Sequence, residues 1–163
     1  MKKWTPIFFL LVFAACKTTY PNEKKLTYTA PVKIGDAWAP KKALLGTPDK
    51  MGDNFSSYFS QGMIVYTNAE GVEVNGLVFT WFMGGAHFTG EIYGIRLGDT
   101  YPKASRLWGE PTESGAVTPD YYEKKWKFRK FMVSVQFWVQ AGDDENLGGH
   151  YEADTVKRIQ ITT

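Results

Sequence analysis

Residues that could support catalysis or bind a metal are sparse in this sequence of 163 residues. Its two histidines, His87 and His150, lie far apart, and neither has another histidine or a cysteine at the spacing of a metal site. Zinc takes about three or four protein ligands, so we expect neither a metal centre nor a bound cofactor. Nucleophilic catalysis requires an activated side chain beside a base, and Ser134 falls inside an expected strand rather than on a sharp turn. These residue types favour a protein that is not an enzyme.

Aromatic side chains are abundant, because Phe, Trp and Tyr make up 16% of the chain. Exposed aromatic side chains beside cationic ones are typical of protein interfaces. We therefore predict protein-binding contacts, on an open sheet face or its connecting loops, at Trp81, Phe82, His87, Phe88, Trp126 and Trp138. The alternative is that these rings fill the thin core beneath a small sheet.

The charge balance argues against a nucleic-acid partner. Nineteen Lys and Arg face 17 Asp and Glu, so the net charge is only +2, too small for binding driven by bulk positive charge. One basic run surrounds Trp126 and contains Lys124, Lys125, Lys127, Arg129 and Lys130. It is expected either to be a solvated strand edge that resists edge-to-edge pairing or to be a site for anionic lipid or glycan.

Residues 1–15 have the pattern of an export signal. Lys2 and Lys3 precede an apolar run, Ile7–Phe13, and the small residues Ala14 and Ala15 follow it. The apolar run is too short to cross a bilayer, which takes about 20 residues. The sequence therefore predicts that residues 1–15 are a signal peptide removed on export.

The only cysteine of the chain, Cys16, follows this signal directly. Val12–Cys16 resembles the lipobox of bacterial lipoproteins, with Phe13 in place of the usual leucine. In that family the cysteine thiol takes a diacylglycerol and the new N-terminus is acylated, so the resemblance implies lipidation of Cys16. An ordinary secretory signal with a chance cysteine is the alternative.

The residues after Cys16 are polar as far as about Lys25, so we expect 16–31 to be a lipidated cysteine with a polar tether. Lys17 rather than an aspartate follows the cysteine. In enterobacterial lipoproteins an aspartate there retains the protein in the inner membrane. The resemblance therefore implies a lipid-anchored protein of the cell envelope, at the outer membrane rather than the inner one.

The rest of the chain contains an internal repeat with a spacing of 63 residues. Five positions recur: Gly35, Asp36, Leu44, Gly46 and Pro48 match Gly98, Asp99, Leu107, Gly109 and Pro111. The pattern predicts two short helices, with Asp36 and Asp99 (or Thr100) as N-caps. The paired glycines are expected to end each helix in a left-handed conformation, and the prolines to prevent its resumption.

Runs of β-forming residues follow each expected helix. The expected strands cover 62–67, 72–82 and 87–97 in the first unit and 121–128, 131–140 and 156–162 in the second, with a polar turn over 143–149. The sequence thus predicts an α+β fold of two tandem repeats, 32–96 and 97–163. Each repeat is a short helix packed on an antiparallel meander, and the two together form one curved sheet with its helices on one face.

The doubled Gly-Asp…Leu-Gly-x-Pro pattern resembles two groups of bacterial proteins. One is the SmpA/OmlA type of envelope lipoprotein, which is accessory to outer-membrane barrel assembly. The other is the tandem-repeat β-lactamase inhibitory protein. Both act by binding protein and have no active site. The resemblance implies a non-catalytic envelope protein that binds another protein as an inhibitor or assembly accessory, and no particular binding residue carries over. The alternative is an enzyme or binder that acts on envelope glycan through an acidic or aromatic site.

Overall fold

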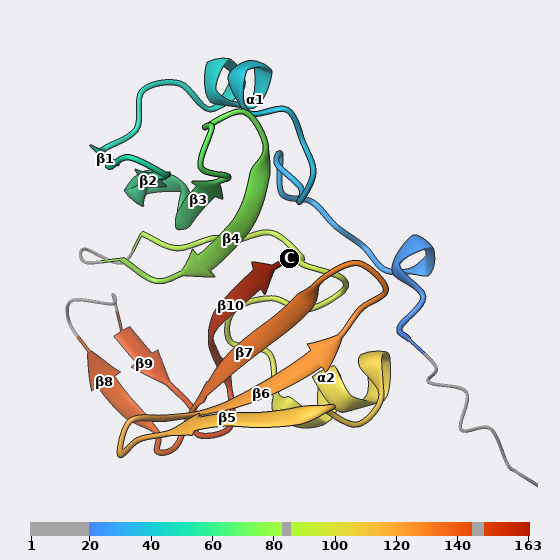
Figure 1. Ribbon diagram of the computed structural model, residues 1–163. Helices are drawn as coiled ribbons and strands as arrows, with labels where there is room; N and C mark the ends of the chain where they lie inside the picture. The colour runs from blue at the N-terminus through green and yellow to red at the C-terminus, as the bar shows by residue number, and fades with distance from the viewer. Residues whose placement is uncertain (1–19, 83–85, 145–148) are drawn as a thin grey trace, which may run out of the picture.

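The computed structural model describes residues 20–82, 86–144 and 149–163 (Figure 1). The expected signal peptide and Cys16 lie outside these ranges, as does most of the expected polar turn over 143–149. No helix within these ranges combines the length and the apolar character that a membrane span requires.

Eight strands form one antiparallel sheet in the order β1-β2-β3-β4-β10-β7-β6-β5, so the fold is mixed α and β with a mostly antiparallel sheet. The elements of the first half are the 3-10 helix η1 (Glu23–Lys25), α1 (Trp38–Leu45), β1 (Lys50–Met51), β2 (Phe55–Tyr58), the 3-10 helix η2 (Phe59–Gln61), β3 (Met63–Thr67) and β4 (Val74–Thr80). Those of the second half are α2 (Tyr101–Trp108), β5 (Glu113–Val117), β6 (Tyr121–Lys127), β7 (Met132–Trp138) and β10 (Val156–Thr162). A separate hairpin joins β8 (Gly142–Asp144) to β9 (Gly149–Tyr151).

The centre of the sheet is the antiparallel pair β4 and β10, the last strands of the two halves. Phe79 of β4 lies opposite Ile159 of β10, which in turn lies opposite Val135 of β7. Along the chain α1 precedes β1–β4, whereas α2 precedes β5–β7 and β10. In space α1 lies beside the β1–β4 part of the sheet and α2 beside the β5–β7 part (Figure 1).

A tight turn before each helix is closed by an aspartate. The Asp36 Oδ2 atom accepts a hydrogen bond from the backbone N–H of Lys33 at 2.8 Å, and the Asp99 Oδ2 atom accepts one from Arg96 at 2.7 Å. In the two turns Gly35 and Gly98 have φ of 83° and 84°, which favours glycine because a Cβ would be strained there. The aspartates are not the N-caps, which are Ala37 and Thr100. The alternative position Thr100 is thus confirmed for the second helix, but neither N-cap residue makes a capping hydrogen bond with its side chain.

Glycine ends each helix, as the sequence predicts, but in a different conformation. Gly46 has φ 81° and ψ −155°, and Gly109 has φ 82° and ψ −171°. This is an extended region of positive φ that is essentially restricted to glycine, not the left-handed helical region that was expected. The chain consequently leaves each helix in an extended path towards the next strand.

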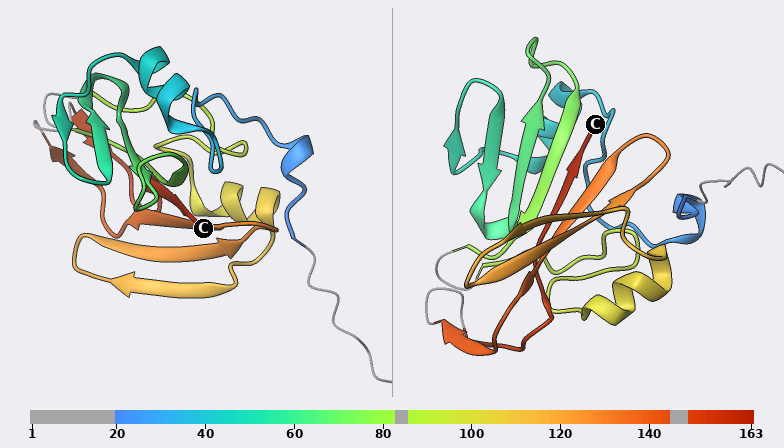
Figure 2. Two further views of the ribbon diagram at one scale, coloured as in Figure 1. Left: turned by 45° about the horizontal axis from the view of Figure 1, so that its top comes forward. Right: turned by 60° about the horizontal axis from the view of Figure 1, so that its bottom comes forward.

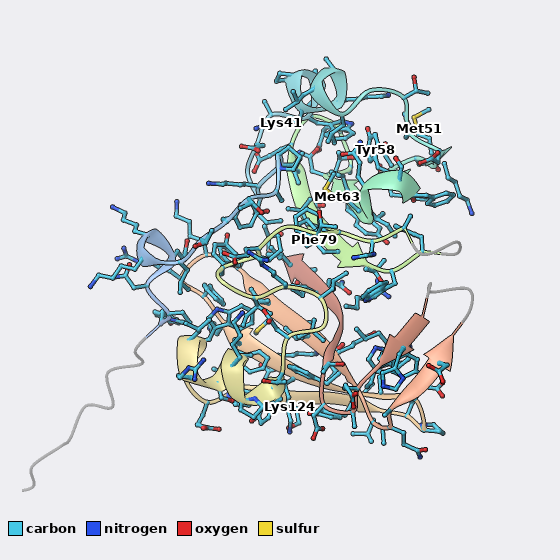
Figure 3. The ribbon with its side chains drawn as sticks, turned by 180° about the vertical axis from the view of Figure 1, so that it is seen from behind. Lys41, Met51, Tyr58, Met63, Phe79 and Lys124 are labelled. Carbon is cyan, nitrogen blue, oxygen red and sulfur yellow. The ribbon has the colours of Figure 1, made fainter. Side chains whose placement is uncertain are left out.

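One hydrophobic core lies on the helix side of the sheet. Trp38 and Leu45 of α1 and Ala104 and Trp108 of α2 enter the same cluster as the inward residues of the strands. In β7 the expected alternation is present, because Val133, Val135 and Phe137 are buried and the residues between them are less so, except Trp138. Ile92 and Ile95 are also in this core, and from behind the stretch between β4 and α2 crosses in front of the sheet (Figure 3).

Several expected boundaries differ from the structure. The run 87–97 is not a strand and contributes only the isolated bridges Trp81–His87 and Ile92–Ile95, because its backbone crosses the core side instead of extending the sheet. The strands β1, β2 and β5 were not expected, and β8 and β9 occupy the two ends of the expected polar turn over 143–149. Part of the expected tether, 16–31, packs on the domain: Leu26 and Tyr28 contact the core and Ala30 is buried.

We predict that the two aspartate turns stabilise the fold equally. Asp36→Ala or Asp99→Ala removes the acceptor of a backbone N–H and an ion pair to Lys41 or Lys103, which should cost about 1–2 kcal/mol in each case. Chemical denaturation measures the free energy of unfolding. Asp53→Ala is the control, because Asp53 is exposed and makes no side-chain hydrogen bond or ion pair within the described ranges. It should stay within about 0.5 kcal/mol of the unmodified chain. Losses of unfolding free energy as small as that of Asp53→Ala would show that the two turns do not stabilise the fold.

Candidate functional site

The structure separates the six predicted contact residues into a core residue, a covered residue and a partly exposed group. Trp126 is a correction, because it is 1% exposed and lies in the core. Its indole N–H donates to the Gly109 carbonyl at 2.8 Å, and its ring meets Trp108 edge-on at 5.3 Å between centroids. A side chain buried in this way fills the core and offers no surface to a partner.

Trp138 faces the side of the sheet away from the helices but is covered there. The Tyr151 ring of β9 stacks on it with centroids 4.0 Å apart, and the Lys157 ammonium lies 4.0 Å from its ring centroid. Its exposed fraction is only 7%. The β8–β9 hairpin therefore folds back over the end of β7, and Trp138 anchors this hairpin instead of facing solvent.

The other predicted residues gather where β4 ends, and we call Phe59, Trp81, Phe82 and His87 the loop-end cluster. The Trp81 and His87 rings stack at 3.9 Å between centroids, and the Phe82 ring contacts Phe59 at 4.8 Å. Phe59 is 38% exposed and the other three are half-buried. Phe88, the neighbouring predicted residue, turns inward and packs on Phe79 of the core, with 4.7 Å between the ring centroids.

Gly62 fixes the backbone that carries this cluster. It follows η2 with φ 64° and ψ 31°, and its N–H donates to the Phe59 carbonyl at 3.0 Å. A Cβ atom at Gly62 would overlap the backbone of His87 and Phe88. The segment after β4 therefore packs directly on the turn before β3, and only glycine permits this approach.

The sheet face away from the helices, one of the two places expected for the aromatic contacts, is mainly polar. Strand register places Ser134 and Gln136 of β7 on this face, beside Gln160 and Arg158 of β10. The buried Ser134 Oγ and Arg158 Nε atoms have no hydrogen-bond partner among the described residues. Tyr66, 36% exposed, is the large ring that lies most openly over this face, packed against Gly76. The partly exposed rings among the predicted contact residues thus lie at the loop end and not across the face.

The basic run is not an exposed strand edge, because β5 pairs with β6 and covers it. Lys124 reaches the Ser114 hydroxyl at 3.0 Å, and Lys125 lies 3.5 Å from the Glu123 carboxylate. Only the end of the run, Lys127, Arg129 and Lys130, is exposed. The cationic part of the run is therefore concentrated at the turn between β6 and β7.

The β8–β9 hairpin carries a histidine between two carboxylates. The His150 Nε2 atom lies 3.0 Å from Glu152 Oε1, and its Nδ1 atom lies 3.0 Å from Asp143 Oδ1. These hydrogen bonds raise the pKa of His150 above its ordinary value, with Glu152 the larger cause. The charged imidazolium can donate to both carboxylates at once, so protonation favours the closed hairpin.

Clefts in the described part of the chain show no built catalytic centre. One of about 640 Å³ lies beside η1 and the β6–β7 turn, with Lys24, Lys33 and Lys130 mixed among Glu23 and Glu73. Burial raises the pKa of the Tyr28 and Tyr93 hydroxyls beside it, so both stay protonated. No group of three or more metal-ligating side chains converges among the described residues.

Comparison with known proteins returns no match to a family model, a curated protein or a solved structure. The assignment of function therefore depends on the residues themselves. Sequence reasoning missed two residues of this region, Phe59 and Tyr151. Only the fold shows that the Phe59 ring covers Phe82 and that the Tyr151 ring covers Trp138.

We predict that Gly62→Ala disrupts the loop-end cluster. The added methyl group must displace the His87–Phe88 backbone and occupy a left-handed conformation, which should cost about 2–4 kcal/mol. Gly71→Ala is a matched control, since Gly71 also has positive φ, 68°, but a methyl group added there would meet no atom within 4 Å. It should cost about 1 kcal/mol in thermal or chemical unfolding. Equal losses would mean that backbone strain alone, without the close approach, determines the result.

We also predict a raised histidine pKa that depends on the hairpin carboxylates. Proton NMR titration should place the His150 pKa above 6.5. The group is charged in the folded hairpin, so its contribution is complete below the unfolded value and is lost as pH rises through the folded pKa. Glu152→Gln should lower the pKa more than Asp143→Asn does, because Glu152 makes the larger contribution. A His150 pKa at or below 6.5 in the unmodified chain would contradict this geometry.

Proposed function

We propose that this chain is a non-catalytic, lipid-anchored protein of the bacterial cell envelope that binds another protein through the loop-end cluster. The observation that carries the proposal is the pair of partly exposed aromatic contacts, Trp81 with His87 and Phe82 with Phe59, where the segment after β4 packs on η2. Rigid aromatic side chains lose little conformational entropy on binding and dominate interface energies. The lipobox-like sequence ending at Cys16 supports the anchor, and Lys17 supports delivery to the outer membrane.

The proposal includes an internal duplication of the fold. Three features recur 63 residues apart: the glycine turn closed by an aspartate, a helix of eight residues, and a glycine that ends it. Even the hydrogen bonds to the closing strands correspond. Gly35 N–H donates to the Val74 carbonyl at 2.8 Å, and Gly98 N–H donates to the Val156 carbonyl at 2.9 Å. Two such units joined through β4 and β10 would bring the end of β4 and the loop between β7 and β10 to the same end of the sheet.

The loop end is favoured over the polar sheet face because it is where exposed aromatic area is concentrated. The β8–β9 hairpin lies at the same end as the C-terminal end of β4 in Figure 1 and in both views of Figure 2. The half-buried Tyr151 of this hairpin covers Trp138 of β7, so Tyr151 is the ring that the second half of the chain offers at this end. A partner bound at this end would therefore contact the loop-end cluster and Tyr151.

We predict that Trp81→Ala together with Phe82→Ala abolishes partner binding without unfolding the chain. The unmodified chain is used to capture envelope proteins, a dominant partner is identified by mass spectrometry, and its affinity is then measured pairwise. Removing two hot-spot rings should weaken binding at least about 30-fold. Circular dichroism verifies the fold of each variant.

Tyr66→Ala is the matched control, because Tyr66 is an exposed ring on the polar face. It should leave the affinity within about twofold of the unmodified value. Loss of binding with Tyr66→Ala and not with the double variant would move the site to the sheet face. Binding to cell-wall glycan fragments in place of protein would instead favour the glycan alternative.

A further inference from the structure

The start of the described chain lies close to the expected lipid. Three residues separate Cys16 from Tyr20, and four extended residue steps reach at most about 14 Å. Residues Tyr20–Lys24 line a cleft of about 490 Å³ together with Arg129 and Lys130 of the β6–β7 turn. Whatever surface holds an acylated Cys16 must therefore come close to this turn.

Two aromatic side chains build the turn so that its cations point outward. Phe128 is 1% exposed, and its N–H donates to the Phe131 carbonyl at 2.9 Å. The Phe128 and Phe131 rings stack at 5.1 Å, and the Tyr93 ring packs on both, at 5.1 and 5.3 Å. The two residues between them, Arg129 and Lys130, are exposed. The rings thus fix a rigid base for a cationic tip.

Lys24 of η1 lines the same cleft as Arg129 and Lys130 of the turn. With Lys25, the next residue of η1, and Lys127, at the end of β6, they make up what we call the basic tip: Lys24, Lys25, Lys127, Arg129 and Lys130. All five side chains are exposed, and none forms an ion pair within the described part of the chain. The stretches 20–25 and 127–130 contain a single carboxylate, Glu23. Five cations against one anion give a local charge of +4, which the net charge of +2 for the whole chain conceals.

We propose that the basic tip rests on the anionic phospholipid headgroups of the membrane that holds the lipid anchor. This inference builds on the proposed lipidation of Cys16. Lysine and arginine side chains close to an anionic bilayer are attracted to it, and the attraction falls off within a Debye length of about 10 Å. Four extended residue steps keep Tyr20, which lines the cleft with Arg129 and Lys130, within about 14 Å of Cys16, a distance on the order of the Debye length. The lipid anchor would keep the protein on the membrane, and the basic tip would determine which side of the domain faces the membrane.

Orientation follows from the positions of the two ends of the molecule. η1 and the β6–β7 turn lie at one side, whereas the end of β4 and the β8–β9 hairpin lie at the other, in Figure 1 and in both views of Figure 2. A domain that stands on its basic tip therefore directs the loop-end cluster away from its own membrane. The partner would be met from the aqueous side.

The charge part of this proposal is tested without acylation, using residues 16–163 with Cys16→Ser, which contain the whole described fold. Sedimentation is measured with vesicles of phosphatidylcholine alone and with vesicles containing about one-third phosphatidylglycerol. We expect binding to the anionic vesicles only. Arg129→Glu with Lys130→Glu should reduce the partition coefficient at least about 10-fold, because each lost cation alone is equivalent to about fivefold.

Lys42→Glu with Lys50→Glu is the control, because it makes the same change in net charge on α1 and β1, away from the tip (Figure 1). It should reduce partition less than about threefold, and raising NaCl to about 0.5 M should abolish binding of the unmodified chain. Equal losses in the two double variants would replace the basic tip by a simple net-charge effect. Equal binding to neutral and anionic vesicles, or none to either, would overturn the proposal.

Lysine-specific acetylation of the acylated protein tests the orientation. On anionic vesicles Lys24, Lys25 and Lys130 should react at least about fivefold more slowly than in detergent, while Lys50 reacts equally in both. Uniform reactivity would overturn the orientation. The mass of the N-terminal peptide separately reports acylation of Cys16. An unacylated peptide would reject the proposed anchor, and with it the fixed orientation, while the vesicle sedimentation would still decide whether the tip binds headgroups.

Discussion

The antiparallel pairing of β10 with β4 is the contact on which the rest of the structure depends. β10 is the last strand of the chain, and it enters the sheet between β4 and β7. Its Ile159 and Ile161 lie between Phe79 and Leu77 on one side and Val135 and Val133 on the other. All six side chains are essentially buried. Without β10, the backbone edges of β4 and β7 that now pair with it would be unpaired. Each half of the sheet would then be a smaller and less stable unit.

This pairing also explains why the helices can be so short. A helix of eight residues is not stable alone in water, so α1 and α2 must obtain their stability from tertiary contacts. Each contributes one tryptophan to the common core, Trp38 or Trp108. The Trp108 indole N–H is satisfied by the Tyr93 carbonyl at 2.8 Å, so the large ring is buried without leaving an unpaired donor. The segment that carries Tyr93 thereby connects the second helix to the turn that holds the basic tip.

The sequence predicts those parts of the fold that local chemistry determines. Glycine at 46 and 109 ends the helices, and the alternation of β7 identifies its buried side, because each depends on residues close in sequence. The segment 87–97 has the apolar content of a strand, yet its isoleucines face the core across the sheet and its backbone pairs only at isolated bridges. No local pattern distinguishes these outcomes, since an apolar run fits either a strand or a covering segment.

The candidate site was predictable only in part for the same reason. Alternation correctly separates Phe137 from Trp138, but the burial of Trp138 depends on Tyr151, which approaches from a different hairpin. Trp126 carries lysines on both sides and has the appearance of a surface residue, yet its register opposite Val133 directs it inward. Phe59 had no motif to mark it, because its contact with Phe82 exists only when β3 and β4 pair. Long-range pairing, and not residue type, decides which aromatic rings remain available to a partner.

The same pairing gives the molecule two chemically different ends. The end of β4 and the β8–β9 hairpin bring half-buried aromatic rings together, where desolvation strengthens contacts with another protein. The β6–β7 turn hides its aromatic rings and exposes its cations, where contact with a charged surface needs little desolvation and weakens with salt. Because these features lie at the two ends of strands that run the length of the sheet, a ligand at one end need not compete with a ligand at the other. The sheet would separate the two proposed functions by distance, which a single exposed face could not do.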